Sequence, residues 1–507
     1  MATATAQALS PAAREFVENG PRRLVIGAEQ VEAADGRTFE TIDPATGDVI
    51  CEVALAGPED VERAAQAARA ALEGPLRKVN AAKRSSLMYS LAELIKANGD
   101  ELAELESLDN GKPLAAAKGD MAAAVNHLRY YAGWPTKIEG ETIPVSARDV
   151  LCYTLREPVG VCALIVPWNF PLLMAVWKVA PALAAGCPAI LKPAEQTPLT
   201  ALRLGELALG AGFPEGTLNV LTGDGTTGAA LVDSPGVHKV AFTGSTEVGR
   251  EIGAKCGRSL KRVTLELGGK SPNIILPDAD LDAAIKGSYQ GIYFNSGQAC
   301  NAGSRLFVQR ELFDEVIERL AGYAREAKLG PGLDPETELG PLVSEEQLAR
   351  VKGYIDSGVR EGAELAAGGS PDGGDGTSGD GGLPSGGYFV PPTLFTGVED
   401  SMRIAREEIF GPVLVAMPFE DLEEVARRAN DTEYGLAAGL WTRDISNAHK
   451  LAAMLQAGNV YINTWGGGDP AAPFGGYKAS GIGREKGHAN LDAYLETKTV
   501  WVGLAGA

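Results

Sequence analysis

This 507-residue sequence has few histidines, and its cysteines are not paired in any CxxC motif. It contains four histidines, and its six cysteines are scattered, with no CxxC pair and no cluster of cysteine with histidine. This scarcity argues against a structural zinc site and against a disulfide framework, so no metal is predicted. Because scattered thiols are typical of a reducing compartment, we expect a cytoplasmic protein.

Basic residues are in deficit as well. The chain has 46 Lys and Arg against 66 Asp and Glu, which gives a formal net charge of −20. This charge disfavours nonspecific binding to nucleic acid or to anionic membranes, so neither is expected as a partner.

An uninterrupted apolar run of membrane-spanning length is also missing. Residues 158–177 carry no charge, but Pro158, Pro167 and Pro171 divide them into a predicted strand, loop and helix. Residues 1–16 lack the apolar core of a signal peptide and are predicted to form a loose tail.

Alternating β-rich and helical apolar runs are what the sequence has in abundance. They predict an α/β fold of two or three domains, with parallel sheets and crossover helices. The first series has predicted strands at 161–166, 189–192, 218–221 and 239–242, and predicted helices at 172–185 and 199–209. The second series, after Gly269, has predicted strands at 273–276 and 305–308 and predicted helices near 279–289 and 313–327. Further helices are predicted at 61–72 and within 80–130, and residues 493–504 form a predicted terminal strand whose edge can add to the sheet of another subunit.

A glutamate and a cysteine thirty-four positions apart are the strongest chemical signal. Glu266 lies in the sequence LELGGK and Cys300 in GQACN, both beside glycines that let a ligand approach the backbone. A thiol is a nucleophile mainly as the thiolate and needs an activating group. No histidine is near Cys300 in the sequence, so a carboxylate that accepts a proton directly or through water is the simplest interpretation.

Three segments are candidates for nucleotide binding. Residues 223–228 match the dinucleotide pattern GxGxxG, with Glu247 at the spacing of a ribose-binding acid, although a glycine-rich turn explains the same pattern. A second strand-to-helix junction follows residues 239–242, where Thr243 or Ser245 is predicted to cap the helix and leave N–H groups for an anion. Lys192 and Glu195 end a third strand and suit ribose hydroxyls, or form a surface ion pair.

Seven motifs in order resemble those of the NAD(P)-dependent aldehyde dehydrogenase superfamily, over nearly the whole chain. They are PWNFP at 167–171, KPAE at 192–195, FTGST at 242–246, LELGG at 265–269, GQAC at 297–300, EIFGP at 408–412 and PFGGYK at 473–478. The resemblance is to the non-phosphorylating, hydrolytic type. It implies oxidation of an aldehyde to a carboxylic acid by way of a cysteine thiohemiacetal and a thioester.

The resemblance implies a role for each residue of the motifs. Cys300 is the implied nucleophile, Asn169 with the N–H of Cys300 the oxyanion hole, and Glu266 the base that activates water to hydrolyse the thioester. Lys178 and Glu485 are implied as a possible proton relay, with ordinary structural charges on a helix and on the surface as the alternative.

The implied cofactor is NAD, with NADP use left open. Lys192 and Glu195 would contact the adenosine ribose, so Glu247 loses that role, and the Glu195 carboxylate would repel a 2′-phosphate. The implied cofactor residues are Ile165, Trp168, Lys192, Glu195, Gly225, Gly244, Ser245, Val248, Leu267, Glu408 and Phe410.

The implied substrate tunnel is aromatic and suits an apolar aliphatic or aromatic aldehyde. Its implied residues are Phe170, Met174, Trp177, Phe294, Trp465 and Phe474. The chain departs from the family at the tunnel mouth, where Gly466, Gly467 and Gly468 replace bulkier residues and leave room. A semialdehyde or an aminoaldehyde therefore stays as the alternative substrate.

The resemblance also implies a division into domains and a homodimer or homotetramer. The implied Rossmann-like NAD-binding domain comprises residues 1–140 and 158–268, the α/β catalytic domain 269–483, and a small β oligomerisation segment 141–157 and 484–507. A low-complexity stretch at 368–387 is predicted to be a solvent-exposed insertion of unassigned role.

Rival functions fit the sequence less well. Relatives that release acyl-CoA generally lack the glutamate present here as Glu266, and phosphorylating relatives pair their cysteine with a histidine. A catalytically silent member would be expected to lose Cys300, Asn169 or Glu266. A thiol hydrolase using Cys300 alone leaves the cofactor motifs unexplained.

Overall fold

Two large sheets and a small three-stranded sheet organise the chain. The computed structural model describes residues 9–369, 384 and 386–504. The predicted insertion at 368–387 therefore lies almost entirely outside the described residues. Between Glu266 and Pro272 the chain leaves the first large sheet and enters the second, which agrees with the predicted start of a second series after Gly269.

The first sheet has eight strands in the order β19-β11-β10-β7-β8-β9-β1-β2, and its five central strands are parallel. The central strands are β7 (Cys162–Ile165), β8 (Ala189–Lys192), β9 (Leu218–Val220), β10 (Lys239–Thr243) and β11 (Arg262–Glu266). The outer strands β1 (Leu24–Ile26), β2 (Glu29–Val31) and β19 (Gly481–Ile482) are antiparallel to their neighbours.

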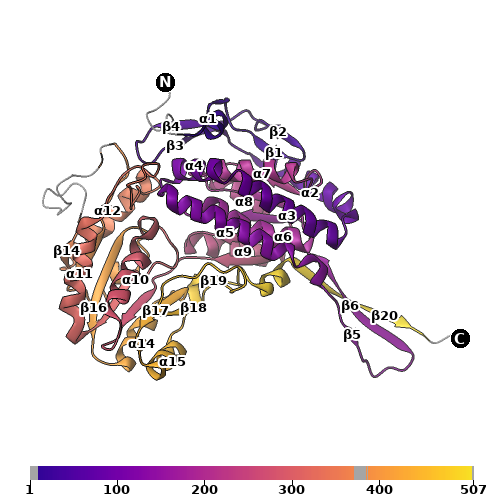
Figure 1. Cartoon of the computed structure of the whole chain (residues 1–507). Helices are drawn as coiled ribbons and strands as arrows, with labels where there is room; N and C mark the ends of the chain where they lie inside the picture. The colour runs from indigo at the N-terminus through magenta and orange to yellow at the C-terminus, as the bar shows by residue number, and fades with distance from the viewer. Residues whose placement is uncertain (1–8, 370–383, 385, 505–507) are drawn as a thin grey trace.

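Helices cover both faces of this sheet (Figure 1). One face carries α6 (Pro171–Ala185) and α7 (Leu199–Gly210), with α3 (Ala81–Ala97), α4 (Gly99–Asn110) and α5 (Leu114–Ala132) packed outside them. The other face carries α2 (Pro58–Glu73), α8 (Gly225–Asp233) and α9 (Thr246–Ser259). We refer to them as the α6 face and the α9 face.

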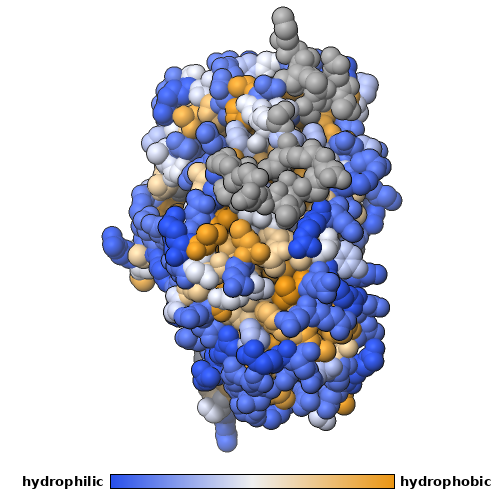
Figure 2. Space-filling model, turned by 90° about the vertical axis from the view of Figure 1, so that its left-hand side faces the viewer, coloured by the Kyte–Doolittle hydropathy of each residue, from blue (hydrophilic) through white to orange (hydrophobic). Residues whose placement is uncertain are grey.

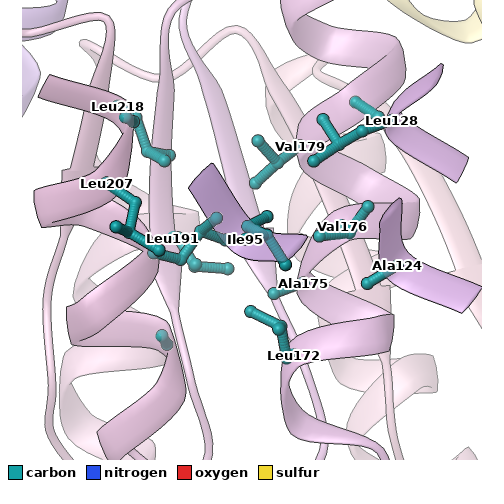
Figure 3. Packing of buried hydrophobic residues seen from close by; sticks show 14 of the residues in the cluster. Ile95, Ala124, Leu128, Leu172, Ala175, Val176, Val179, Leu191, Leu207 and Leu218 are labelled. Atoms are coloured by element: carbon teal, nitrogen blue, oxygen red, sulfur yellow. The ribbon is translucent and has the colours of Figure 1, made fainter. Parts of the chain in front are cut away.

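Side chains of the central strands alternate between these two faces, as the pleat of a strand requires. On β8, Leu191 packs in the core of the α6 face and Ile190 in that of the α9 face. Figure 3 shows Leu191 among side chains of α6 and α7 on the α6 face, including Leu172 and Leu207. Because each central strand is buried on both faces, it is an almost continuous apolar run in the sequence.

The second sheet has seven strands in the order β14-β15-β16-β13-β12-β17-β18, all parallel except β14. The strands are β12 (Pro272–Ile275), β13 (Arg305–Gln309), β14 (Glu364–Ala367), β15 (Thr393–Thr396), β16 (Val413–Phe419), β17 (Ala437–Trp441) and β18 (Asn459–Ile462). Its helices are α10 (Leu281–Tyr293) and α11 (Phe313–Glu326) in one core, and α12 (Glu345–Arg360), α13 (Arg403–Arg406), α14 (Leu422–Asn430) and α15 (Ile445–Met454) in the other.

A narrow arm projects from the body of the molecule (Figure 1). It is formed by β5 (Thr142–Ile143), β6 (Val150–Pro158) and β20 (Leu495–Gly503), in the order β20-β6-β5. The arm exposes apolar side chains, among them Leu155 and Trp501. The predicted terminal strand is thus confirmed. It pairs with β6 of its own chain, and within the described residues its other edge pairs with no strand.

The prediction of a loose N-terminal tail is wrong for the residues of the tail that the structure describes, from residue 9 on. Residues Pro11–Glu18 form α1, and Ser10 caps it by accepting a hydrogen bond from Ala13 N. Phe16 and Val17 are buried in the core of the α6 face, and this tertiary packing outweighs the loose composition. A two-stranded sheet of β3 (Thr38–Ile42) and β4 (Val49–Ala54) follows.

One face of the molecule shows how polar and apolar side chains are distributed. The face seen in Figure 2 is mostly hydrophilic, with apolar side chains gathered near its centre. Within the described ranges, no helix combines the length and hydropathy that crossing a membrane would demand. The predicted domain boundaries stay a prediction.

Candidate active site

The candidate residues gather at the carboxyl ends of the parallel strands of the first sheet. Ile165 ends β7, Lys192 ends β8 and Glu266 ends β11, while Gly244 directly follows β10. The strand order reverses at β7, since β8 and β9 lie on one side of it and β10 and β11 on the other. Open α/β sheets form a ligand crevice at such a switch point.

Side-chain alternation sends two groups of candidate residues to opposite faces. Phe242 and Leu265 pack in the core of the α9 face. Their neighbours Thr243 and Glu266 therefore point to the α6 face. There the buried Lys178 of α6 donates a hydrogen bond of 2.7 Å to Thr243 Oγ1. Proton-handling groups thus lie on the α6 face.

Lys178 and Glu485 form a buried ion pair between their Nζ and Oε1 atoms. The second oxygen of Glu485, Oε2, has no hydrogen-bond partner among the described residues. This pair acts electrostatically on Glu266. The negative charge of Glu485 raises the pKa of Glu266, and the positive charge of Lys178 lowers it. The two residues predicted as a relay are therefore neither surface charges nor isolated from the base.

Glu266 is a buried carboxylate, and no described residue neutralises its charge by direct contact. Neither of its oxygens accepts a hydrogen bond from any described residue. Burial, followed by the charge of Glu485, raises the pKa of Glu266 well above its ordinary value. Gly475 presses close to it, since a Cβ there would lie 2.7 Å from Glu266 Oε1. Such a carboxylate binds a proton strongly and fits a general base.

The two glycines that follow Glu266 allow other segments of the site to approach the backbone closely. A Cβ at Gly269 would lie 2.4 Å from the carbonyl oxygen of Cys300, and one at Gly268 would lie 2.4 Å from Glu408 Oε2. A larger side chain at Gly269 would push the Cys300 segment away, and one at Gly268 would displace the carboxylate of Glu408. This close approach is the physical reason for the paired glycines that follow Glu266 in the sequence.

The loop that holds Cys300 is strained before the nucleophile. Asn295 and Ser296 have φ of 51° and 54°, in the left-handed region that side chains rarely adopt. Gly297 follows with φ of 72°, and a Cβ there would lie 2.0 Å from the carbonyl oxygen of Gly411. Strain of this kind persists where the surrounding structure fixes the chain, and it clusters at functional sites.

Cys300 is half-buried. Burial first, and then the negative charges of Glu408 and Glu266, raise the pKa of its thiol to about 12. The backbone N–H groups of Cys300 and Asn301 oppose this rise. Like the other five cysteines it is a free thiol.

Asn169 lies beside the nucleophile segment. Its Nδ2 donates a hydrogen bond of 2.8 Å to the carbonyl oxygen of Gln298, two residues before Cys300. Asn295 Nδ2 in turn donates to the carbonyl oxygen of Asn169 at 3.0 Å. The amide nitrogen of Asn169 has two hydrogens, so one remains for an oxyanion formed at Cys300.

The predicted ribose residues lie together at the end of β8. Lys192 is buried and faces Glu195, with 3.4 Å between its Nζ and Glu195 Oε2. Burial lowers the pKa of Lys192, and Glu195 opposes that effect. Nearby, Gly225 begins α8 and has open space where a Cβ would stand. The GxGxxG pattern is therefore an exposed strand-to-helix turn next to Lys192.

The predicted pyrophosphate segment is a capped helix start. Ser245 caps α9 and accepts a hydrogen bond of 3.3 Å from Val248 N, as one of the two predicted caps. Val248 is 43% exposed although it is apolar. Leu267 is buried in the core of the α9 face and contacts this helix, since a Cβ at Gly249 would lie 2.3 Å from its Cδ2.

The EIFGP segment brings a second set of groups to the same crevice. Glu408 Oε1 accepts a hydrogen bond of 2.8 Å from Gly269 N, and burial raises the pKa of Glu408 to about 7. Phe410 has φ of 61° and packs edge-on against Trp168, with 5.2 Å between ring centroids. Two implied cofactor residues from separate motifs, Trp168 and Phe410, therefore meet.

The predicted tunnel residues form two aromatic pairs. Phe170 stacks on Phe294 with ring centroids 6.2 Å apart, and Trp177 packs edge-on against Phe474 at 5.4 Å. Met174 is buried in the same core as Trp177 and Phe474, and Cys300 packs against that core.

The predicted tunnel residue Trp465 fills a slot between three glycines. A Cβ at Gly291, Gly303 or Gly439 would lie within 2.4 to 2.9 Å of its ring. The ring also lies 5.7 Å from that of Tyr461.

Sequence analysis missed two buried lysines among these aromatic rings. Lys112 Nζ lies 4.5 Å from the ring centroid of Phe170, and Lys486 Nζ lies 5.1 Å from that of Trp177. Lys112 pairs with Glu106 and Asp120. No signal in the sequence separates these lysines from surface lysines, since only the tertiary packing buries them.

The residues present fit a dinucleotide. A buried ammonium faces a carboxylate at the end of β8, a capped helix begins after β10, and an apolar side chain, Val248, is exposed between them. These groups suit a ribose, a pyrophosphate and a base, respectively. Within the described ranges, no cluster of three or more His, Cys, Asp or Glu side chains is placed to hold a metal ion.

Known proteins resemble this chain along most of its length. The sequence model of the aldehyde dehydrogenase family matches residues 31–500. The mitochondrial aldehyde dehydrogenase of Rattus norvegicus is 48% identical over 505 residues, which cover 99% of this chain and 95% of that protein.

Two solved structures share the fold. An NAD+ complex of an aldehyde dehydrogenase from Bacillus cereus superposes with a TM-score of 0.94 at 51% identity, over 98% of this chain and 99% of that one. A betaine aldehyde dehydrogenase from Staphylococcus aureus in complex with NAD+ superposes with a TM-score of 0.93 at 40% identity, over 98% and 97% of the two chains.

Proposed function

The chain belongs to the aldehyde dehydrogenase family, and from that premise we propose that Cys300, Glu266 and Asn169 oxidise an aldehyde to its carboxylic acid. The observation that carries this proposal is the placement of Glu266. It is a buried carboxylate with both oxygens unpartnered among the described residues, and it lies three residues before Gly269, which closely approaches the segment of Cys300.

The first step uses Cys300 and Asn169. The Cys300 thiol loses its proton to water, and the resulting thiolate attacks the carbonyl carbon and forms a thiohemiacetal. Asn169 Nδ2 and the N–H of Cys300 donate to the oxygen that becomes negative, and such donors stabilise a transition state by roughly 3 kcal/mol each. When bound, NAD serves as the hydride acceptor, which leaves a thioester on Cys300.

The second step uses Glu266. Its carboxylate takes a proton from a water molecule, whose oxygen attacks the thioester carbon and releases the carboxylic acid and the Cys300 thiolate. The proton held by Glu266 has a path toward Glu485 and Lys178, which lie on the same face of the sheet. Because Glu266 is present, we favour hydrolysis over transfer of the acyl group to coenzyme A.

We expect the reaction to become faster as pH rises from the acidic side. The reactive forms are the Cys300 thiolate and the Glu266 carboxylate, and burial raises the pKa of both groups. Below a raised pKa the deprotonated fraction grows about tenfold for each pH unit. Rapid mixing of the NAD-loaded enzyme with an aldehyde should give a burst rate that increases with pH. A pH-independent burst would show that deprotonation of Cys300 does not limit the first step.

We propose NAD as the preferred cofactor, with Lys192 and Glu195 at the adenosine ribose and Glu408 and Phe410 at the nicotinamide. Two structures of the fold were solved with NAD+. The remaining proposed cofactor residues are Ile165, Trp168, Gly225, Gly244, Ser245, Val248 and Leu267, all described above.

The Glu195→Ser substitution is expected to raise the ratio of kcat/KM for NADP to that for NAD by at least about tenfold. The reason is that serine removes the carboxylate that would repel a 2′-phosphate. Steady-state rates with both cofactors measure the ratio. Glu247→Ser is the matched control, because the GxGxxG pattern would assign the ribose to Glu247. A larger effect at Glu247 than at Glu195 would reverse the assignment.

We propose a homodimer or homotetramer that forms through the arm. The edge of β20 that is free among the described residues and the exposed apolar side chains of the arm support this proposal.

We propose the cytoplasm as the location, supported by six free thiols and a bacterial relative of 51% identity. The division into an NAD-binding domain (1–140 and 158–268), a catalytic domain (269–483) and the oligomerisation segment (141–157 and 484–507) is likewise a proposal.

The substrate we propose is an aldehyde that enters along Phe170, Phe294, Trp177 and Phe474. Aromatic pairs favour an apolar chain next to the carbonyl. Betaine aldehyde, which the name of the Staphylococcus aureus relative specifies, is a cationic alternative. The charges around Trp177 and Phe474 decide between these classes.

A further inference from the structure

Lys486 is a buried cation without a carboxylate partner. Only 2% of the residue is exposed. Its Nζ makes one long hydrogen bond of 3.4 Å, to the carbonyl oxygen of Gly467. Among the described residues no carboxylate lies at ion-pair distance, and the charge of Asp469 reaches it only from further away. Buried charges are normally paired, so this ammonium lacks its counterion.

The backbone turns Lys486 toward the aromatic residues of the site. Its φ of 61° is in the left-handed region, which is costly for lysine. The turn places Nζ 5.1 Å from the ring centroid of Trp177 and 5.9 Å from that of Phe474.

These rings connect Lys486 to the reacting groups. Cys300 packs against the large core of the α6 face, of which Trp177 and Phe474 are members. Phe474 precedes Gly475, which presses against Glu266. Lys486 itself follows Glu485 in the chain. The ammonium therefore lies at the aromatic wall, within one residue of the proposed proton relay.

A second buried donor beside Lys486 also lacks a partner. Trp177 Nε1 has no hydrogen-bond acceptor in the described part of the chain. His127 stacks on Trp177 at 5.5 Å, and its Nδ1 contacts the carbonyl oxygen of Ala123 at 2.7 Å. Burial, assisted by the charge of Lys486, lowers the pKa of His127 to about 4, so the ring is neutral. Lys486 is thus the cation of this cluster.

The glycine segment beside Lys486 lies at the surface, where Gly467 and Gly468 are exposed. Gly466 and Gly468 have no atom within 4 Å of the position of a Cβ, and a Cβ at Gly467 would have one neighbour at 3.9 Å. The glycines that replace bulky residues at the predicted tunnel mouth therefore border the buried ammonium.

We propose that the aldehyde substrate carries a carboxylate at the end remote from its carbonyl, and that Lys486 binds this carboxylate. The inference rests on the proposed function and names its substrate class, the semialdehydes of dicarboxylic acids. Trp177 Nε1 is a second donor for the same group.

The same lysine disfavours cationic aldehydes. The faces of Trp177 and Phe474 would attract a quaternary ammonium group, but the ammonium of Lys486 already occupies them. A second cation there meets like-charge repulsion. The site therefore differs from one built for betaine aldehyde.

The test compares pairs of aldehydes of equal shape. Succinic and adipic semialdehydes are each measured against their methyl esters, with NAD, in the wild-type protein and in Lys486→Met. We expect the ratio of kcat/KM for acid over ester to fall by at least about tenfold in the variant, mainly through KM for the acid. Lys486→Arg should keep most of the preference. Lys450→Met, on the exposed face of α15, is the matched control and should keep the wild-type ratio.

Betaine aldehyde is expected to respond to the substitution in the opposite direction from the semialdehydes. Its kcat/KM relative to the methyl esters should rise in Lys486→Met. Equal changes for acid, ester and betaine aldehyde would mean a purely structural lysine and would overturn the proposal while the proposed function stands. Failure of the wild-type protein to reduce NAD with any of these aldehydes would overturn both. Melting temperatures of all variants identify any loss of folding, and Lys486→Arg then decides.

Discussion

Replacing Cys300 by alanine is expected to abolish aldehyde-dependent reduction of NAD, by roughly four orders of magnitude in kcat or more. The reason is that the thiohemiacetal and the thioester both form on the Cys300 sulfur. Alanine leaves the carbonyl carbon without a nucleophile, whatever the substrate. NADH absorbance with saturating aldehyde and cofactor measures the loss.

The matched control is Cys51→Ala. Cys51 is a buried free thiol whose pKa burial also raises to about 12, but it lies on β4, apart from the candidate site. It should reduce NAD at a rate close to that of the wild-type protein. Appreciable turnover by Cys300→Ala would show that the hydride comes from an adduct formed elsewhere and would remove the central residue of the proposed function.

The second large effect is expected for Glu266→Gln, which should lower steady-state turnover by roughly two to four orders of magnitude. Glutamine has nearly the same shape but cannot take a proton from water. Thioester formation does not use Glu266 as the base in the proposed mechanism. One burst of NADH per active site should therefore remain, followed by an almost flat trace.

Mass spectrometry of the protein after that burst should find the acyl group on Cys300. Added hydroxylamine should release it and restart turnover, because an external nucleophile replaces the activated water. A variant with no burst would indicate that Glu266 is required for attack by the thiol, which was the first interpretation of the pair. Normal steady-state turnover would exclude Glu266 from the deacylation step.

Motifs and periodicity predicted the parts of this protein that depend on local chemistry. The run of apolar residues before Lys192 indicated a buried parallel strand, and β8 is one. Ser245 was one of two predicted helix caps, and it is the one that caps α9. These features follow from a few neighbouring residues, so the sequence alone contains them.

Features that depend on residues far apart were beyond the sequence. β19 pairs with β11, although more than two hundred residues separate them. Trp465 fills a slot between Gly291, Gly303 and Gly439, which no local pattern indicated, and its tunnel role stays a prediction. Lys486 and surface lysines have the same sequence signature, and only the packing of Trp177 and Phe474 over it distinguishes them. Such contacts need the arrangement of the whole chain.

The alternation of side chains along the first sheet also bears on how this protein can be changed. Lys192 extends from the α9 face, whereas Lys178 and Glu266 meet on the α6 face, with the backbone of the sheet between them. Substitutions at sites that share no partner usually have additive free-energy effects. Changes that exchange the cofactor should therefore combine freely with changes that alter the hydrolysis step, so that an engineered variant can acquire the two traits in either order.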